Sequence, residues 1–249
     1  FFQWLIHGIK EKYPQVIFIA EVYRKELYHK YIREVGFDYL YDKSGLYDVL
    51  RAVVEKNGQS ATGITHNWQF LGDLQPYMLN FLENHDEQRF ASDFFGKKAE
   101  DTMAALSISL LLNTAPFMIY FGEEIGERGM DEEGFSGCDG RTTIFDWWSV
   151  ASIRRLRKVI QSESYKTMDV KKLIDAGLEE GEADLFCKFA GLTRFAASDP
   201  AITSGTTYDL NYCNVCSDGF NKDKHFAFSE TTRNILFWWL QTSPELMRE

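Results

Sequence analysis

Apolar residues along the chain follow two patterns, helical spacing and short continuous runs. Phe2, Leu5, Ile6 and Ile9 repeat at helical spacing before Pro14, which predicts a helix over the first thirteen residues. Similar spacing predicts helices over 25–36, 44–58, 97–114 and 150–161, and Gly36 and Gly58 are predicted to end the first two of these. Continuous β-rich runs predict strands over 16–21, 37–42, 77–84 and 117–121. The segment that holds Trp68 and Gly72 is expected to be looser.

The order of these elements is one helix followed by four strand–helix pairs. It predicts parallel strands joined by right-handed helical crossovers, either in an open doubly wound sheet or in a (β/α)8 barrel. No glycine-rich phosphate loop follows any predicted strand, which disfavours the nucleotide-binding form of the open sheet. Four strand–helix units would make half of a barrel.

Composition limits the partners of the chain. Its 249 residues are 45 % hydrophobic and 15 % aromatic, enough for a large core. A net charge of −10 argues against nucleic acid or an anionic membrane as a partner and suits a neutral substrate. The uncharged stretch from Met103 to Phe121 is long enough to span a bilayer. Ser107, Asn113 and Pro116 instead favour a buried helix, a break and a buried strand, so we predict no membrane span.

Four cysteines include one CxxC pair, Cys213 and Cys216. A zinc site would need a second ligand pair, and a thioredoxin-like site would begin a helix. We therefore predict free or structural thiols and no metal site. No signal peptide is visible, but the chain does not begin with Met, so its true start is expected to be missing. The location stays open, with the cytoplasm favoured.

Ionisable residues follow three of the four predicted strands: Glu21, then His85 and Asp86, then Glu123 and Glu124. In a barrel all of them would lie at the carboxyl-end face, where barrel enzymes do their chemistry. Paired carboxylates suit glycoside cleavage, in which one protonates the leaving oxygen and the other attacks or stabilises the oxocarbenium-like centre. Crowding raises the pKa of the acid, so that it keeps its proton near neutral pH.

A hard-cation site is the competing use of the same residue types. Aromatic residues favour sugar instead, because flat rings suit sugar faces, although most of the candidates are expected to be ordinary core or loop residues. Those expected near the strand ends are Tyr23, Trp68, Phe90, Phe95 and Tyr120.

Three segments, FIAEVY (18–23), FLENHDEQRF (81–90) and PFMIYFGEEIG (116–126), occur in this order and at separations that resemble the second half of an α-amylase-family glycoside hydrolase. The segment DGRTTIFDWW (139–148) also resembles the stretch after the eighth strand of some members. The likeness runs from about Phe1 to Ser229. It implies an α/β fold, the second half (strands 5–8) of a (β/α)8 TIM barrel, followed by the beginning of a truncated C-terminal β domain.

The resemblance implies a retaining mechanism on α-glucosidic bonds of starch or maltooligosaccharides. Glu21 would be the general acid/base, and Asp86 would stabilise the transition state and hold substrate hydroxyls. His85 would bind the sugar, while Asn84 and Arg89 would shape the same loop. The expected substrate-binding residues are His85, Asn84, Arg89 and Tyr23. The loop that carries Glu124 would have a more structural role.

The chain departs from the family pattern in two ways. Ala20 stands where many members have Gly before the acid, a mild change. The nucleophile motif of the family, Gly-Phe-Arg-x-Asp-like, occurs nowhere in the 249 residues. We therefore expect a partial chain that lacks the nucleophile and the first four strands, with 1–204 as the partial barrel and 205–249 as the truncated β domain. No cofactor is expected in this chain. The resemblance allows for calcium in the full-length enzyme.

Two other interpretations stay open: a non-catalytic glucan-binding remnant of such an enzyme, and a metal-dependent α/β enzyme with Asp86, His85 and Glu21 as ligands. The expected partner is an α-glucan or maltooligosaccharide, with no nucleic acid and no membrane. Unpaired barrel edges would allow self-association. The residues do not distinguish hydrolase from transglycosylase, or one glycosidic specificity from another.

Overall fold

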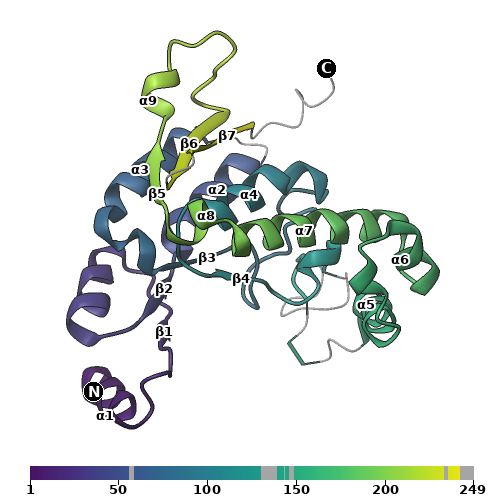
Figure 1. Ribbon diagram of the computed structural model, residues 1–249, viewed down its shortest axis with the longest axis horizontal. Helices are drawn as coiled ribbons and strands as arrows, with labels where there is room; N and C mark the ends of the chain where they lie inside the picture. Colours follow the sequence, from purple (N-terminus) through teal and green to yellow (C-terminus); the bar gives the residue numbers. More distant parts are fainter. Residues whose placement is uncertain (56–58, 130–138, 143, 146–148, 233–234, 242–249) are drawn as a thin grey trace. The chain divides into compact units, whose positions relative to one another are not determined.

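The computed structural model describes residues 1–55, 59–129, 139–142, 144–145, 149–232 and 235–241. The chain divides into two compact units (Figure 1). The first unit comprises Phe1–Phe81, Ile108–Met118 and the described residues from Pro200 onward, and the second comprises Leu82–Ser107 and the described residues of Ile119–Asp199.

A parallel sheet lies at the centre of the first unit. Its strands are β1 (Ile19–Ala20), β2 (Tyr39–Tyr41), β3 (Met78–Phe81) and β4 (Phe117–Met118). They pair in the order β1-β2-β3-β4, and every pair is parallel. The predicted α/β class with a parallel sheet is confirmed. Strand order follows chain order, whereas an open doubly wound sheet reverses its order at a switch point.

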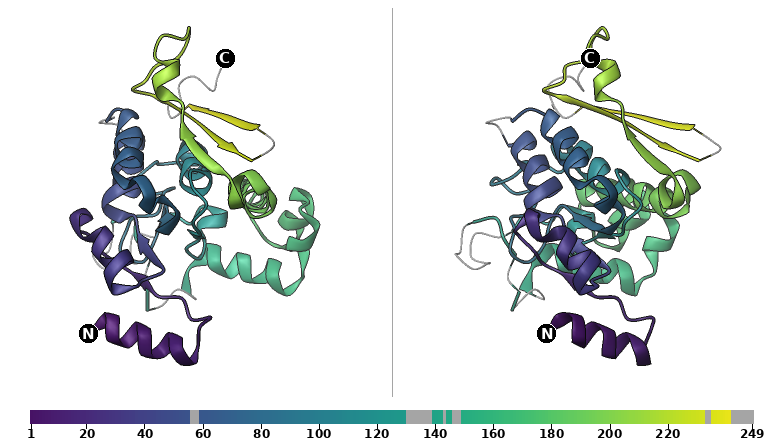
Figure 2. Two further views of the ribbon diagram at one scale, coloured as in Figure 1. Left: turned by 60° about the vertical axis from the view of Figure 1, so that its left-hand side comes forward. Right: turned by 90° about the vertical axis from the view of Figure 1, so that its left-hand side faces the viewer.

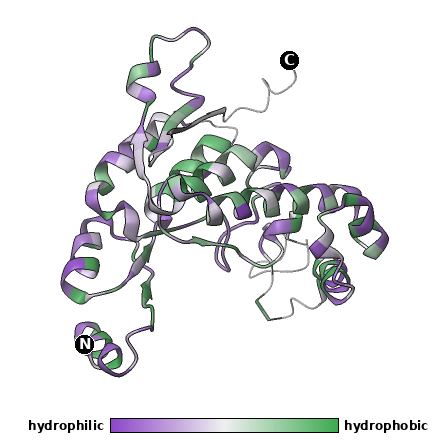
Figure 3. Ribbon diagram, in the orientation of Figure 1, coloured by the Kyte–Doolittle hydropathy of each residue, from purple (hydrophilic) through white to green (hydrophobic). Residues whose placement is uncertain are grey.

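The helices of this part of the chain agree with the predicted pattern in most places. Helix α1 (Phe2–Lys12) ends before Pro14 as predicted, and Gly36 ends the next helical segment with a φ of +93°. The other helical segments are the 3₁₀ turn Lys25–Leu27, the π-helical turns Lys30–Val35 and Lys43–Tyr47, α2 (Asp48–Val54), α3 (Thr62–Leu71), the 3₁₀ turns Gly72–Tyr77 and Glu100–Thr102, and α4 (Met103–Leu111). Helix α4 carries no charged residue and is predominantly hydrophobic in Figure 3.

Several local predictions were wrong or fall outside the described residues; one is the strand predicted over 117–121, which is only Phe117–Met118. The strand predicted over 16–21 is only Ile19–Ala20, because β2 pairs with these two residues alone. The segment expected to be loose contains helix α3, whose Ile64 and Leu71 are buried. Helix α2 ends at Val54, and the predicted stop at Gly58 lies outside the described residues.

The core of the first unit lies between α1, the turn Lys30–Val35, the parallel strands and α3. Leu40 and Met78 are fully buried on neighbouring strands. The buried cluster is Ile6, Ala20, Val22, Tyr28, Ile32, Phe37, Leu40, Leu71, Leu74 and Met78. Burial of this apolar surface stabilises the strand ends that carry the candidate site.

An antiparallel sheet follows near the C-terminus of the chain, after helix α8 (Pro200–Ser204). Its strands are β5 (Thr206–Asp209), β6 (His225–Thr231) and β7 (Ile235–Gln241), in that order, and helix α9 (Asn211–Asn214) lies between the first two. Strands β6 and β7 run side by side in Figure 2, with Ser229 opposite Phe237. The predicted domain boundary between 204 and 205 stays a prediction.

Glu230 on β6 is buried, and its pKa makes stability depend on pH. Thr207 Oγ1 donates to Glu230 Oε1 over 2.6 Å, while burial raises the pKa of Glu230 from 4.5 to about 8. Between these two values the folded chain keeps a proton that the unfolded chain releases, so this group lowers the free energy of unfolding as pH rises.

We expect Glu230→Gln to remove this part of the pH dependence, which by pH 8 lowers the stability of the wild type by up to about 4 kcal/mol. Urea unfolding of both proteins at pH 5 and pH 8 measures the difference. If the free energy of unfolding falls by the same amount from pH 5 to pH 8 in the wild type and in Glu230→Gln, the expectation is contradicted.

Three helices dominate the second unit: α5 (Ala151–Gln161), α6 (Val170–Ala176) and α7 (Glu180–Ser198). A capping box of Glu179 and Glu182 begins α7, and Arg155 on α5 pairs with Glu182. The apolar cluster that these helices share is Ile125, Leu156, Val159, Leu173, Leu178 and Ala183. The 3₁₀ turn Ser164–Thr167 joins α5 to α6.

Among the described residues, no helix is both long and apolar enough to cross a membrane. Cys187, Cys213 and Cys216 are free thiols, and Cys138 lies outside the described residues.

Candidate active site

Glu21 directly follows β1 in the first unit and is exposed to solvent. The Tyr23 hydroxyl donates to Glu21 Oε1 over 2.6 Å. The pKa of Tyr41, at the end of β2, is raised by partial burial and by the nearby Glu21 carboxylate. Glu21 is therefore an accessible carboxylate at the carboxyl end of the sheet, held by one hydroxyl donor.

A tight turn over Asn84–Glu87 carries the second group of predicted residues, in the second unit. Asn84 is buried, and its Oδ1 accepts from the backbone N–H groups of Asp86 (2.9 Å) and Glu87 (2.8 Å). This Asx-type turn leaves the side chains of His85 and Asp86 half exposed, with 3.6 Å between His85 Nε2 and Asp86 Oδ1. An imidazole and a carboxylate that reach solvent side by side can bind neighbouring hydroxyl groups.

Arg89 closes this loop from inside the protein. Its guanidinium is fully buried and donates to Glu83 Oε2 (2.7 Å), Thr142 Oγ1 (2.7 Å) and the Phe121 carbonyl (2.8 Å). It also lies 4.4 Å from the centre of the Tyr120 ring. In this position Arg89 contacts Glu83 at the start of the loop and two groups from later in the chain.

Glu83 forms the other end of this clamp. Its Oε1 accepts from the Phe90 N–H over 2.6 Å, so Glu83 and Arg89 bracket the turn that carries His85 and Asp86. Burial raises the pKa of Glu83 to about 7, while the Arg89 guanidinium and the Phe90 N–H oppose that shift.

The loop after β4 holds two further carboxyl groups. Glu123 is buried and accepts from the Tyr120 N–H over 2.9 Å. Burial and the neighbouring Glu83 carboxylate raise the pKa of Glu123 well above its usual value. Burial also raises the pKa of Glu124.

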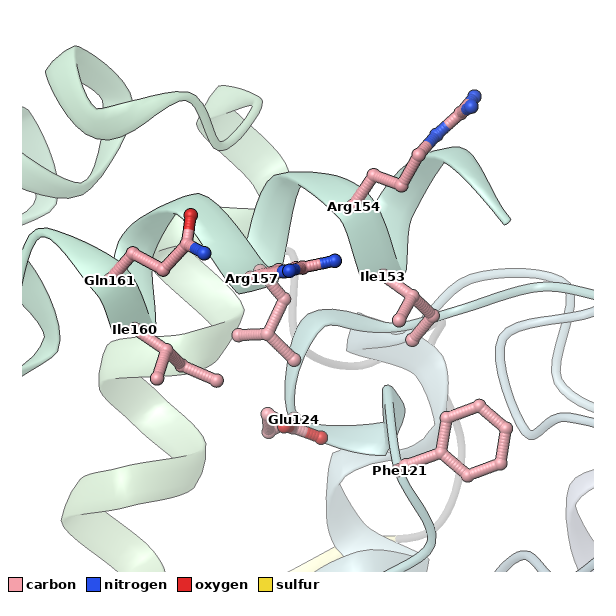
Figure 4. Close-up of a pocket in the computed structure, with 8 residues that line it drawn as sticks. Phe121, Glu124, Ile153, Arg154, Arg157, Ile160 and Gln161 are labelled. Carbon is pink, nitrogen blue, oxygen red and sulfur yellow. The ribbon is translucent and has the colours of Figure 1, made fainter. Parts of the chain in front are cut away.

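Glu124 lines an apolar pocket of about 870 Å³ in the second unit (Figure 4). Phe121 and helix α5 form its walls, with Ile153, Leu156 and Ile160 as the apolar lining and Arg157 among the polar groups. None of the residues predicted to bind substrate lines this pocket, so it is separate from the turn at His85.

The structure brings Asn84, His85 and Asp86 together in one turn that Arg89 flanks, and it brings Glu21 and Tyr23 together. Their roles in catalysis and substrate binding stay predictions. Glu83 was not among the predicted site residues, and its pairing with Arg89 was not predicted, although opposite charges six residues apart around a polar turn are a signal that points to such a clamp. Among the described residues, no group of three or more His, Cys, Asp or Glu could hold a metal ion.

The family model described as "Alpha amylase, catalytic domain" matches residues 3–184, most of the chain. The chain belongs to the alpha-amylase family and is by family an alpha-amylase-like hydrolase. No curated protein matches the chain.

Solved structures share this fold at low sequence identity. An α-amylase from H. orenii is 18 % identical with a TM-score of 0.63, over 97 % of this chain and 46 % of that one. A cyclic α-maltosyl-(1→6)-maltose hydrolase from Arthrobacter globiformis, in complex with maltose, is 18 % identical with a TM-score of 0.57, over 92 % and 43 %. An Anoxybacillus α-amylase is 17 % identical with a TM-score of 0.60, over 97 % and 44 %. The chain spans less than half the length of these solved chains.

Proposed function

We propose that this chain supplies the general acid/base and a substrate-binding carboxylate of a retaining glycoside hydrolase that acts on α-glucosidic bonds of starch or maltooligosaccharides. The match of the alpha-amylase catalytic domain to residues 3–184 carries the proposal, because it includes the segments around Glu21, Asp86 and Glu124. The maltose bound by the Arthrobacter globiformis enzyme supports the substrate class.

We also propose that the parallel sheet is the second half of the barrel, with β1–β4 as strands five to eight, followed by the beginning of a C-terminal β domain. Two observations support this assignment. Strand order follows chain order, as it does around a barrel, and an antiparallel sheet follows the parallel one in the sequence.

Glu21 is the residue proposed to move protons. In a retaining mechanism one carboxylic acid protonates the leaving oxygen, and as a carboxylate it then activates the water that hydrolyses the covalent intermediate. Glu21 is accessible, and the Tyr23 hydroxyl, at 2.6 Å from Oε1, orients it. Because Tyr23 donates to one oxygen, the other oxygen is the one proposed to exchange the proton.

Asp86 and His85 are proposed to bind sugar hydroxyls, since both reach solvent on one turn. Asn84 and Arg89 act through that turn by holding its backbone and its ends. No nucleophile is assigned, because the family motif that carries it does not occur in the 249 residues. Calcium is proposed only for the full-length enzyme, and no described residue is assigned to it.

Two glycosyl fluorides test the proposal in a chain to which no nucleophile is assigned. β-Maltosyl fluoride mimics the covalent intermediate, so its hydrolysis needs only a general base, whereas α-maltosyl fluoride needs attack from the opposite face. We expect the chain to release fluoride from the β anomer and not from the α anomer, and to leave maltoheptaose intact.

Each other outcome has a defined meaning. If the chain binds maltotriose but releases fluoride from neither anomer, the result would contradict the hydrolase and favour the interpretation of a non-catalytic glucan-binding remnant. Turnover of maltoheptaose that disappears in Glu21→Gln would show that a residue of this chain fills the nucleophile position. A chain that neither binds maltotriose nor releases fluoride would contradict the substrate class.

A further inference from the structure

A polar network in the first unit joins the segment after Glu21 to the end of β2 and to helix α3. Lys25 Nζ donates to Asn67 Oδ1 over 2.8 Å, and Asn67 Nδ2 donates to Asp42 Oδ2 over 3.0 Å. The Leu46 N–H donates to the same Asp42 oxygen over 2.8 Å. Asp42 and Asn67 are only 1 % and 4 % exposed, so these contacts lie in the protein interior. They form the Lys25–Asn67–Asp42 network.

Attraction to the buried Asp42 carboxylate helps to hold the Lys25 ammonium in the network. Burial raises the pKa of Asp42, and the hydrogen bonds from Leu46 and Asn67 together with the Lys25 ammonium oppose that shift, so Lys25 lowers the cost of keeping this carboxylate buried. The Lys25 ammonium also lies 4.5 Å from the centre of the Phe70 ring, on the same helix as Asn67. Helix α3 therefore holds Lys25 by two different contacts.

The backbone around Gly45 is packed closely against the network. A Cβ atom at Gly45 would lie 1.9 Å from Asp42 Oδ1 and 2.7 Å from Asn67 Oδ1. No side chain fits there unless these groups move. The close approach gives Asp42 and Asn67 one defined position.

The network also lies at one end of the segment that carries Glu21. At the other end β1 is fixed by its pairing with β2, where Ala20 is opposite Leu40. The residues between these two anchors include Tyr23, which donates to Glu21. We propose that the Lys25–Asn67–Asp42 network positions Glu21 by holding this segment so that the Tyr23 hydroxyl stays on the Glu21 carboxylate. This proposal rests on the proposed acid/base role of Glu21.

Lys25→Met tests the network, and Lys10→Met is a matched control. Lys10 is a half-buried lysine of the same unit that pairs with Asp38 and lies 6.0 Å from the Phe18 ring, before β1 and β2 begin. Lys10→Met therefore also removes a polar contact and a contact with an aromatic ring, but at the amino ends of β1 and β2, away from Glu21. Lys25→Gln, which keeps a hydrogen-bond donor, serves as a milder second variant if Lys25→Met does not fold.

The first readout is fluoride release from β-maltosyl fluoride, set against maltotriose affinity. In Lys25→Met we expect a rate at saturating substrate about 10-fold lower than in the wild type, with the maltotriose Kd changed less than 2-fold. Lys10→Met should leave both values unchanged per folded molecule. Equal rates in the two variants would overturn the proposal.

The second readout does not depend on turnover. The ¹³Cδ signal of Glu21 is compared in the wild type, Tyr23→Phe, Lys25→Met and Lys10→Met. We expect Lys25→Met to move the signal toward its position in Tyr23→Phe, and Lys10→Met to leave it at the wild-type position. A Glu21 signal in Lys25→Met at the wild-type position would overturn the proposal. Absence of fluoride release in the wild type would instead contradict the acid/base role, while the NMR comparison would still decide whether the network positions Glu21.

Discussion

Arg89→Met is expected to lower the free energy of unfolding of the second unit by about 3–5 kcal/mol. Arg89 and Glu83 are fully buried, and the guanidinium is the charged partner of the Glu83 carboxylate. Without it, Glu83 keeps one backbone N–H donor, from Phe90, and must either stay an uncompensated charge in the interior or bind a proton, because the Arg89 guanidinium is the main group that opposes the rise of its pKa on burial. Thr142 Oγ1 and the Phe121 carbonyl also lose their donor.

The free energy of unfolding of the second unit is measured in urea, with hydrogen exchange of its backbone amides as the probe. Arg128→Met is the control, because its ion pair with Asp93 is exposed and worth about 1 kcal/mol or less. The loss in Arg89→Met should shrink at pH 5, where the buried Glu83 takes up a proton. The double variant Glu83→Gln with Arg89→Met should recover part of the stability, since it leaves no unpaired buried charge. A loss in Arg89→Met no larger than in Arg128→Met would contradict the clamp.

Glu21→Gln is expected to lower the rate of fluoride release from β-maltosyl fluoride by at least about 100-fold. A positioned general base contributes roughly 10²–10⁴-fold to rate, and an amide cannot accept the proton of the attacking water. The Gln carbonyl can still accept the Tyr23 hydrogen bond, so the local geometry should persist and the maltotriose affinity should stay the same.

The control for this variant is Glu26→Gln. Glu26 is an exposed carboxylate five residues further along, and it pairs with Arg24 on the surface. It has the same charge but no place at the end of β1, so its replacement should leave the rate unchanged. A rate in Glu21→Gln above one tenth of the wild-type rate would contradict the proposed role of Glu21.

The accuracy of the sequence analysis varied with how local the deciding interactions are. Helices α1 and α5 lie where helical spacing predicted them, because periodicity and end signals are contained in a dozen residues. Helix α3 was missed, although Ile64, Trp68 and Leu71 have helical spacing. The short extent of β1 depends on how many residues of β2 pair with it, and the sequence of β1 does not contain that information.

The candidate site shows the same division. Glu21, His85 and Asp86 could be singled out from the sequence because each follows an apolar run and belongs to a family motif. The burial of Arg89 could not be predicted, since a charged residue beside a polar turn is ordinarily exposed. Its position depends on partners at Phe121 and Thr142, far along the chain.

The sequence by itself determined the α/β class, the parallel order of the elements, the family and the candidate carboxylates, because these follow from local patterns and short motifs. Only the tertiary structure decided which polar residues support those carboxylates. The Glu83–Arg89 clamp and the Lys25–Asn67–Asp42 network depend on burial and on hydrogen bonds between residues up to 53 positions apart. Such pairs leave no periodic signal, since the folded backbone alone brings their members within bonding distance.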